Sequence, residues 1–320
     1  MRIALVGTFS GWMGIHMEQM ALALEQLGHT VLRIYDAKLR TGFFFRRSFE
    51  DFNRRFRRRL KSFAPDLALI TMSRQYYDFA ALKAEFPHTA IAVWDFDGPN
   101  WRCCQDFQLL RELDLLLTVS RITEREMREN GVNAHYLPHG VDCEYYAPRP
   151  VSPRFASPVS YIGRATPRRA ELSKMLAGYG LALYGRRWLG VAPELKSCIR
   201  GKKDVIGDDV VKIYTSSTCM VNMLQGALAD RHTILSLQVF AIPAAGGCLI
   251  TEHTVELEES FAPGSELLAW NSPEELAEQV RFCTEHPDFA RRIGTAGRER
   301  CLKAHSQTIR MRQLLDFVTR

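Results

Sequence analysis

The sequence of 320 residues lacks any segment that would place it in a membrane. No apolar run approaches the roughly 20 residues that a membrane-spanning helix needs. The N-terminus has an early glycine, Gly7, and no cleavage-site pattern, so it looks like neither a span nor a signal peptide. We therefore expect a cytoplasmic protein.

The sequence also lacks the short motifs of three common chemistries. It has no GxGxxG dinucleotide fingerprint, no GxSxG nucleophile elbow and no CxxC pair among its eight cysteines. Several cysteines lie inside apolar runs, where a thiol acts as a small hydrophobic side chain. We expect reduced thiols, as in a reducing compartment, and no bound metal.

Charge of either sign is not extreme, and the net charge of +6 only weakly favours an anionic ligand. No specific nucleic-acid signal is present. The segment 41–63 concentrates the basic residues Arg54, Arg55, Arg57, Arg58 and Arg59 between regularly spaced phenylalanines. Two interpretations stay open: an amphipathic helix packed on a sheet with a solvated basic side, or a patch that binds an anionic membrane surface at its inner face.

Strands and helices alternate along the chain without hairpin signals, which predicts parallel sheets covered on both faces. A linker rich in proline and serine, from Pro148 to Pro158, separates two such sets. We predict an α/β fold of two doubly wound Rossmann-like domains facing a cleft. The predicted domains are residues 1–147 and 148–304, and a C-terminal helix, 305–320, is expected to pack back toward the N-terminal domain.

The stretch from Ser236 to Phe261 gives the first prediction of a ligand. It predicts a short buried helix ending near Gly246-Gly247, a hydrophobic strand, and a polar turn that starts at Glu252. Glycines let a backbone approach a ligand closely, and loop N–H groups can hold an anion. We expect a phosphorylated ligand at Gly246 and Gly247, with residues 252–261 closing over it.

Asp95-Phe96-Asp97 has the spacing of a DxD metal motif, because two carboxylates two residues apart on an extended segment point the same way. Three interpretations of these aspartates stay open: a metal site, a contact to an acceptor or a general base, and a structural cap or turn.

Longer segments resemble a known family. GWMGIHMEQMALALEQLGHTV (11–31) and LPHGVD (137–142) resemble the N-terminal half of group 1 glycosyltransferases of the GT-B architecture. The C-terminal half looks like the CgeB-like (spore maturation protein B) branch, through segments 161–164, 184–188, 207–222, 240–247, 249–252 and 297–317. The resemblance implies a bacterial-type hexosyltransferase that uses a nucleotide diphosphate sugar as co-substrate, retains the anomeric configuration and needs no metal or other cofactor. The acceptor is unknown.

The resemblance also implies site residues. Arginines just past strand ends would stabilise charge on the leaving diphosphate. The expected catalytic residues are His16, Asp95 and Arg164. The expected donor-binding residues are Gly163, Arg164, Arg168, Tyr184, Arg186, Arg187, Tyr214, Asn222, Phe240, Gly246, Gly247 and Glu252. The expected acceptor-side residues are Gly11, His16, Asp95, Asp97 and His139.

One departure from the family concerns two acidic residues. The family's glutamates, eight positions apart, are replaced here by Thr233 and Ala241. Either Glu252 or Glu258 recognises the ribose instead, or the donor differs, or activity is lost. The last case would make the protein a non-catalytic nucleotide- or glycan-binding member of the family.

Overall fold

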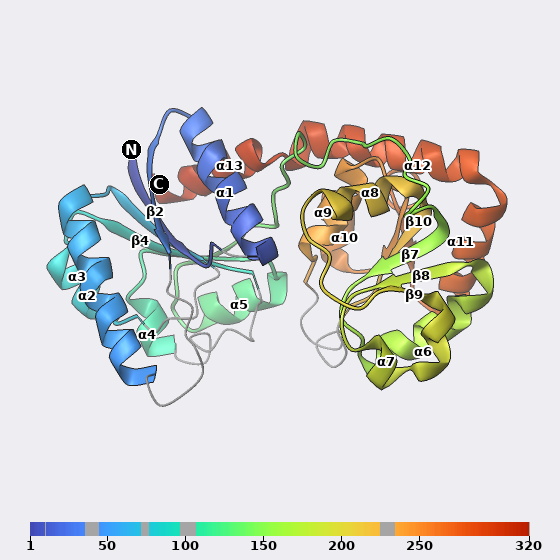
Figure 1. The fold of residues 1–320 in the computed structure, drawn as a ribbon. Coiled ribbons are helices and arrows are strands. Elements are labelled where there is room, and N and C mark those ends of the chain that lie inside the picture. The colour runs from blue at the N-terminus through green and yellow to red at the C-terminus, as the bar shows by residue number, and fades with distance from the viewer. Residues whose placement is uncertain (10, 36–44, 72–76, 97–106, 225–233, 320) are drawn as a thin grey trace. The chain divides into compact units, whose positions relative to one another are not determined.

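A computed structural model describes residues 1–9, 11–35, 45–71, 77–96, 107–224 and 234–319 (Figure 1). The chain folds into two compact units. The first contains Met1–Pro138 together with Gln307–Arg320, and the second contains His139–Ser306. Each unit is described by itself below.

The first unit is a parallel sheet in the order β2-β1-β3-β4-β5-β6. Its strands are β1 (Arg2–Gly7), β2 (Thr30–Tyr35), β3 (Leu67–Thr71), β4 (Ala90–Asp95), β5 (Leu115–Thr118) and β6 (Ala134–Tyr136). Its helices are α1 (Gly11–Gln26), α2 (Phe45–Phe63), α3 (Phe79–Glu85), α4 (Phe107–Arg111), α5 (Arg121–Glu129) and α13 (Gln307–Val318). The inner strands are buried because helices cover both faces of the sheet, whereas the edge strand β2 is only partly buried.

Helix α2 has the predicted amphipathic pattern. Phe52, Phe56 and Leu60 are buried in the core of the first unit. Arg58 and Arg59 are exposed on the same helix. The side chain of Arg57 is about one-third exposed and forms an ion pair with Glu85 of α3. The helix is therefore packed on the sheet with a basic solvent side, and binding of that side to a membrane stays a prediction.

The C-terminal helix α13 belongs to the first unit and packs on α1. Thr308 Oγ1 donates a hydrogen bond to Gln26 Oε1 at 3.2 Å. The chain thus returns to its N-terminal unit for its last helix. No helix in the described ranges is both long enough and apolar enough to cross a membrane.

The second unit is a parallel sheet in the order β12-β11-β10-β7-β8-β9. Its strands are β7 (Ser157–Ile162), β8 (Leu181–Tyr184), β9 (Ile199–Gly201), β10 (Ser217–Asn222), β11 (Leu249–Glu252) and β12 (Leu268–Trp270). Its α-helices are α6 (Pro167–Leu176), α7 (Trp188–Val191), α8 (Asp208–Ser216), α9 (Leu237–Ala244), α10 (Val255–Ser260), α11 (Pro273–Glu285) and α12 (Pro287–Arg300).

Alternate side chains of these strands enter two separate cores. Tyr161 and Leu183 pack in one core with α6 and α11, whereas Ala182 and Met220 pack in the other with α8 and α9. Successive side chains of a strand point to opposite faces, so a sheet buried on both faces needs apolar residues at every position. This explains why the strands are continuous apolar runs in the sequence.

The structure contains elements that the sequence pattern does not predict. Strand β9 and helix α7 are short, and α10 occupies part of the stretch expected to be a loop after Glu252. Thr254 caps α10 by accepting a hydrogen bond from the N–H of Leu257 at 3.2 Å. Elements of three to six residues contain too few repeats for their period to be read from sequence.

Candidate functional site

The second sheet has a topological switch point between β7 and β10. The chain runs from β7 outward through β8 to β9, and then returns to β10 on the other side of β7 and continues to β12 (Figure 1). The loops after β7 and β10 therefore leave the sheet in opposite directions. In open α/β sheets, ligands bind at this place, outside the carboxyl ends of the strands.

Backbone groups next to two glycines form one side of the switch point. The N–H of Gly163 donates to the Tyr184 carbonyl oxygen at 2.9 Å, and a Cβ on Gly185 would lie 2.3 Å from the Gly163 oxygen. A Cβ on Gly163 would lie 2.3 Å from the Tyr161 hydroxyl. Larger residues at these positions would push the two loops apart. Gly163 and Tyr184 are thus placed at the site through their backbone, whereas the Tyr184 side chain is buried in the core.

Polar side chains form the other side. Asn222, at the end of β10, donates from Nδ2 to Ser236 Oγ at 3.3 Å. Gln238 of α9 donates from Nε2 to the Ile162 carbonyl oxygen at 3.0 Å, which joins α9 to the end of β7. Tyr214 is buried and hydrogen-bonds with Gln238, and its pKa is raised, mainly because burial disfavours the phenolate. Ser236 and Gln238 were not predicted, because their role depends on where α9 starts.

Two arginines of α6 hold the loops in place. Arg169 donates from Nη2 to the Met223 oxygen at 2.9 Å and from Nη1 to the Arg164 oxygen at 3.2 Å. Its guanidinium therefore connects the loop after β10 to the loop after β7. Burial raises the pKa of Tyr161, under the Arg169 guanidinium, to about 12, so this phenol stays neutral.

Arg168 is paired with Glu252, the residue at the end of β11. Nη1 of Arg168 lies 3.1 Å from Glu252 Oε2, and Nη2 also pairs with Oε1. Glu252 accepts a further hydrogen bond from the Leu224 N–H at 3.2 Å, and Arg168 donates to the Leu224 oxygen at 3.3 Å. Arg168 and Glu252 thus bind each other, and their expected contacts to phosphate and to ribose stay predictions.

Arg164 is a predicted phosphate contact whose side chain is available. It is exposed, and no described residue pairs with its guanidinium. Arg186 pairs with Asp204, and Arg187 is exposed on the same turn after β8. Of the predicted donor-side arginines, Arg164 lies directly beside the switch point.

The positions of Gly246 and Gly247 contradict the prediction that these glycines hold a phosphorylated ligand. They precede β11, whereas Glu252 ends it, so they lie at the amino end of the sheet, roughly 13 Å of strand away from the ligand edge. A Cβ on Gly294 of α12 would lie 2.2 Å from the Gly246 oxygen. The glycines permit close packing of α12 and do not face a phosphate at the carboxyl edge.

Phe240 and Ala241 also have core positions. Phe240 is fully buried, and its ring centroid lies 5.7 Å from that of Phe261 and 5.2 Å from that of His305. Ala241 is buried in the same core cluster. Phe240 is therefore a packing residue. Ala241, which stands where the family has its ribose-binding acid, has apolar surroundings. Glu258 is exposed and pairs with His253 at 2.8 Å.

Two predicted acceptor-side residues, His16 and Asp95, lie in the first unit. The His16 ring on α1 lies 5.3 Å from the ring of Phe96, which directly follows Asp95 at the end of β4. Both His16 and Asp95 are buried. Burial lowers the pKa of His16 to about 4, against a smaller opposite effect of a hydrogen bond with Gln19, so the imidazole is neutral at pH 7.

The other acceptor-side residues are less informative. Gly11 begins α1 with φ of +63°, a backbone role that suits glycine. His139 is buried and belongs to the second unit. Asp97 and Thr233 lie outside the described residues. Within the described ranges, no cluster of three or more histidine, cysteine or acidic side chains has the geometry of a metal site.

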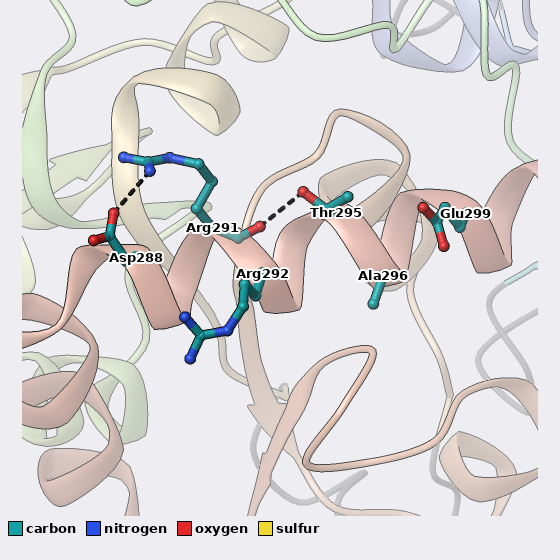
Figure 2. Close-up of a pocket in the computed structure, with 6 residues that line it drawn as sticks. All are labelled: Asp288, Arg291, Arg292, Thr295, Ala296 and Glu299. Atoms are coloured by element: carbon teal, nitrogen blue, oxygen red, sulfur yellow. Dashed lines mark hydrogen bonds and ion pairs between the residues drawn. The ribbon is translucent and has the colours of Figure 1, made fainter.

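The hollow shown in Figure 2 lies elsewhere in the second unit. Its lining comes from one helix, α12: Asp288, Arg291, Arg292, Thr295, Ala296 and Glu299. Arg291 pairs with Asp288 at 2.8 Å, and Thr295 donates to the Arg291 oxygen at 2.9 Å. A surface formed by one helix, with Arg291 already paired to Asp288, is a weaker candidate than the switch point.

Comparison with known proteins identifies the fold of the chain and a family that matches part of it. Residues 168–316, a little under half of the chain, match the family described as glycosyl transferase-like. None of the curated proteins matches the sequence. Among solved structures, sucrose-phosphate synthase from Thermosynechococcus elongatus has a TM-score of 0.73 at 14% identity and covers 99% of both chains.

Two further solved structures share the fold. A glycosyltransferase from Rickettsia africae has a TM-score of 0.70 at 14% identity, covering 98% of this chain and 97% of its own. HepE of Anabaena, solved with UDP and glucose, has a TM-score of 0.67 at 12% identity, covering 100% and 99%. The chain has the two-domain GT-B fold, and its residues 168–316 match the glycosyl transferase-like family.

Proposed function

We propose that the protein is a glycosyltransferase that takes a sugar from a nucleotide diphosphate sugar bound at the carboxyl edge of the second sheet. The observation that carries the proposal is the position of Gly163, Arg164 and Asn222. They follow or end the two strands that flank the switch point of the second unit, whose residues from 168 onward match the glycosyl transferase-like family. HepE, which shares the fold, was solved in complex with UDP and glucose.

The chemistry of sugar transfer fits the groups present. When the bond to the diphosphate breaks, negative charge grows on phosphate oxygens, and a guanidinium can stabilise that charge. Arg164 supplies an exposed guanidinium, while Arg169 holds the loop that carries it. Gly163 and Asn222 shape the surroundings of Arg164 through their hydrogen bonds to Tyr184 and Ser236. By family resemblance, we propose that the reaction retains the anomeric configuration and uses no metal.

Titration calorimetry with UDP and other nucleoside diphosphates tests the donor site. Arg164→Ala should weaken binding of the preferred nucleotide about tenfold, since one charge-assisted contact is lost. Arg292→Ala on α12 removes the same charge from a helix outside the switch point and should leave binding unchanged. Equal effects of the two substitutions, or no binding of any nucleoside diphosphate, would refute this site.

A second candidate is a binding protein without turnover. The apolar surroundings of Ala241 favour it, because no acid stands where the family holds the donor ribose. Release of nucleotide from a panel of nucleotide sugars separates the candidates. Hydrolysis or transfer with any donor supports the enzyme, whereas tight binding with no release of nucleotide supports the binding protein.

A further inference from the structure

The first sheet has a switch point of its own, between β1 and β3. The chain runs from β1 outward to the edge strand β2 and then returns to β3 on the other side of β1. The carboxyl ends of β1 and β3 are close together, because a Cβ on Gly7, the last residue of β1, would lie 1.9 Å from the Thr71 oxygen of β3. Open α/β sheets bind ligands at such a place.

Two aromatic side chains lie at this edge of the first sheet. Phe9 follows β1, and Tyr35 is the last residue of β2, where it pairs in register with Gly7. Their ring centroids are 4.5 Å apart, and the ring planes make an angle of 51°. Phe9 is half-buried, whereas Tyr35 is 54% exposed. An aromatic surface is therefore open to solvent beside the switch point.

The backbone of Phe9 is held by α1. A Cβ on Gly14 of that helix would lie 2.5 Å from the carbonyl carbon of Phe9, so the loop packs directly on the helix. The Tyr35 ring contacts the Phe9 ring that is held in this way. A surface whose side chains are already packed loses little conformational freedom when a ligand covers it.

The charge beside the two rings is neutralised. Arg33 and Tyr35 point to the same side of β2, because side chains two residues apart in a strand do so. The Arg33 guanidinium is paired with two carboxylates of α1, Glu18 at 2.8 Å and Glu25 at 2.7 Å. This cation is therefore not available to an anion, and an uncharged ligand suits the surface better than a phosphate does.

The size and polarity of the surface suit a sugar ring. A pyranose has C–H groups on its faces, which pack on a flat aromatic ring, and hydroxyl groups around its rim. These hydroxyl groups can stay in water or hydrogen-bond with the hydroxyl of Tyr35. The neighbouring residues Thr8 and Arg33 are polar, so the apolar surface extends over the two rings alone and is too short for a lipid chain.

We propose that Phe9 and Tyr35 form a binding surface for an uncharged sugar ring at the switch point of the first sheet. The sugar would rest against the exposed ring of Tyr35, and Phe9 would support that ring from below. This surface does not depend on the donor site of the second unit. Only the identification of the bound sugar as the acceptor rests on the proposed function.

Saturation-transfer NMR of the full-length protein with the methyl pyranosides of glucose, galactose and mannose tests the surface, with and without saturating UDP. At least one pyranoside should bind under both conditions. Tyr35→Leu keeps an apolar side chain but removes the flat ring, and it should weaken binding of the preferred pyranoside about fivefold. Tyr35→Phe should keep most of the affinity. Both variants should melt close to the wild type, because the side chain is mostly exposed.

Phe282→Leu is the matched control. Phe282 is 42% exposed and its ring lies 4.4 Å from that of His286, but it belongs to α11 of the second unit, so pyranoside binding should not change. The proposal is overturned if no pyranoside binds, or if Tyr35→Leu binds it as the wild type does. It is also overturned if Tyr35→Leu weakens UDP instead, because the rings would then bind a nucleobase. If pyranoside binding depends on Tyr35 but UDP does not bind, the sugar surface stands and the donor assignment fails.

Discussion

The pair formed by Arg168 and Glu252 should matter more for stability than the other ion pairs at the carboxyl edge. The Glu252 side chain is 15% exposed and that of Arg168 is 34% exposed. Glu252 accepts hydrogen bonds from the Arg168 guanidinium and from the Leu224 N–H. Glu252→Ala removes all of them and leaves a partly buried guanidinium without its carboxylate. We expect a loss of about 2 kcal/mol in the free energy of unfolding.

Urea unfolding at pH 7, followed by the circular dichroism signal of helices, measures this loss. Glu252→Gln keeps an acceptor for Leu224 and should cost about 1 kcal/mol. In the double-mutant cycle with Arg168→Ala, the coupling energy should be about 1 to 2 kcal/mol. If the second unit melts by itself, 2 kcal/mol corresponds to about 4–8 °C in melting temperature.

The exposed pair of Arg186 and Asp204 is the matched control. Its side chains are 63% and 46% exposed, so Asp204→Ala should cost less than about 0.5 kcal/mol. The reasoning fails if Asp204→Ala costs as much as Glu252→Ala. It also fails if the effects of the Arg168 and Glu252 substitutions simply add, because the two side chains would then not interact.

Three further predictions concern packing, pH and surface charge. Gly294→Ala should destabilise the protein by about 1–3 kcal/mol, because its Cβ would lie 2.2 Å from a backbone oxygen, whereas Gly190→Ala, with open space around it, should be neutral or stabilising in the same unfolding assay. The pKa of His16 is about 4 in the folded protein and 6.5 ordinarily, so the unfolded chain binds the proton first as the pH falls. The free energy of unfolding should therefore decrease by about 3 kcal/mol from pH 7 to pH 4. His16→Gln should lack this part of the pH dependence, and equal pH profiles of the two proteins would contradict the assignment. Arg58→Glu with Arg59→Glu should reduce sedimentation of the protein with anionic vesicles if α2 binds membranes, and unchanged sedimentation would show that its basic side is only solvated.

The main elements of both sheets follow from local pattern. Strand β1 is a buried apolar run, and α11 is capped by Ser272, which accepts a hydrogen bond from the Glu275 N–H at 3.2 Å; serine followed by proline and two glutamates is a local pattern that favours a helix start. These features depend on residues within one turn of each other. The α/β class and the two doubly wound sheets could therefore be predicted from the sequence and are confirmed by the structure.

The roles of individual site residues could be predicted only in part. Arg164 and Asn222 lie at the switch point because each comes just after or at the end of a strand, and the order of strands follows from the fold class. Arg168 has the same sequence neighbourhood, but it is paired with Glu252, 84 residues later in the chain. A local pattern cannot show that a distant carboxylate occupies a guanidinium.

Gly246 and Gly247 show most clearly what the tertiary structure decided. The sequence by itself determined that a glycine pair separates a helix from a strand, because glycine ends helices and begins turns. It did not determine which end of the sheet the pair occupies relative to the ligand, nor that α12 packs against it with the backbone of Gly294. Close contact between backbones far apart in sequence arises only when the helices and the sheet assemble. A glycine pair in a sequence can therefore indicate either close packing or a ligand site, and only the assembled structure shows which of the two it is.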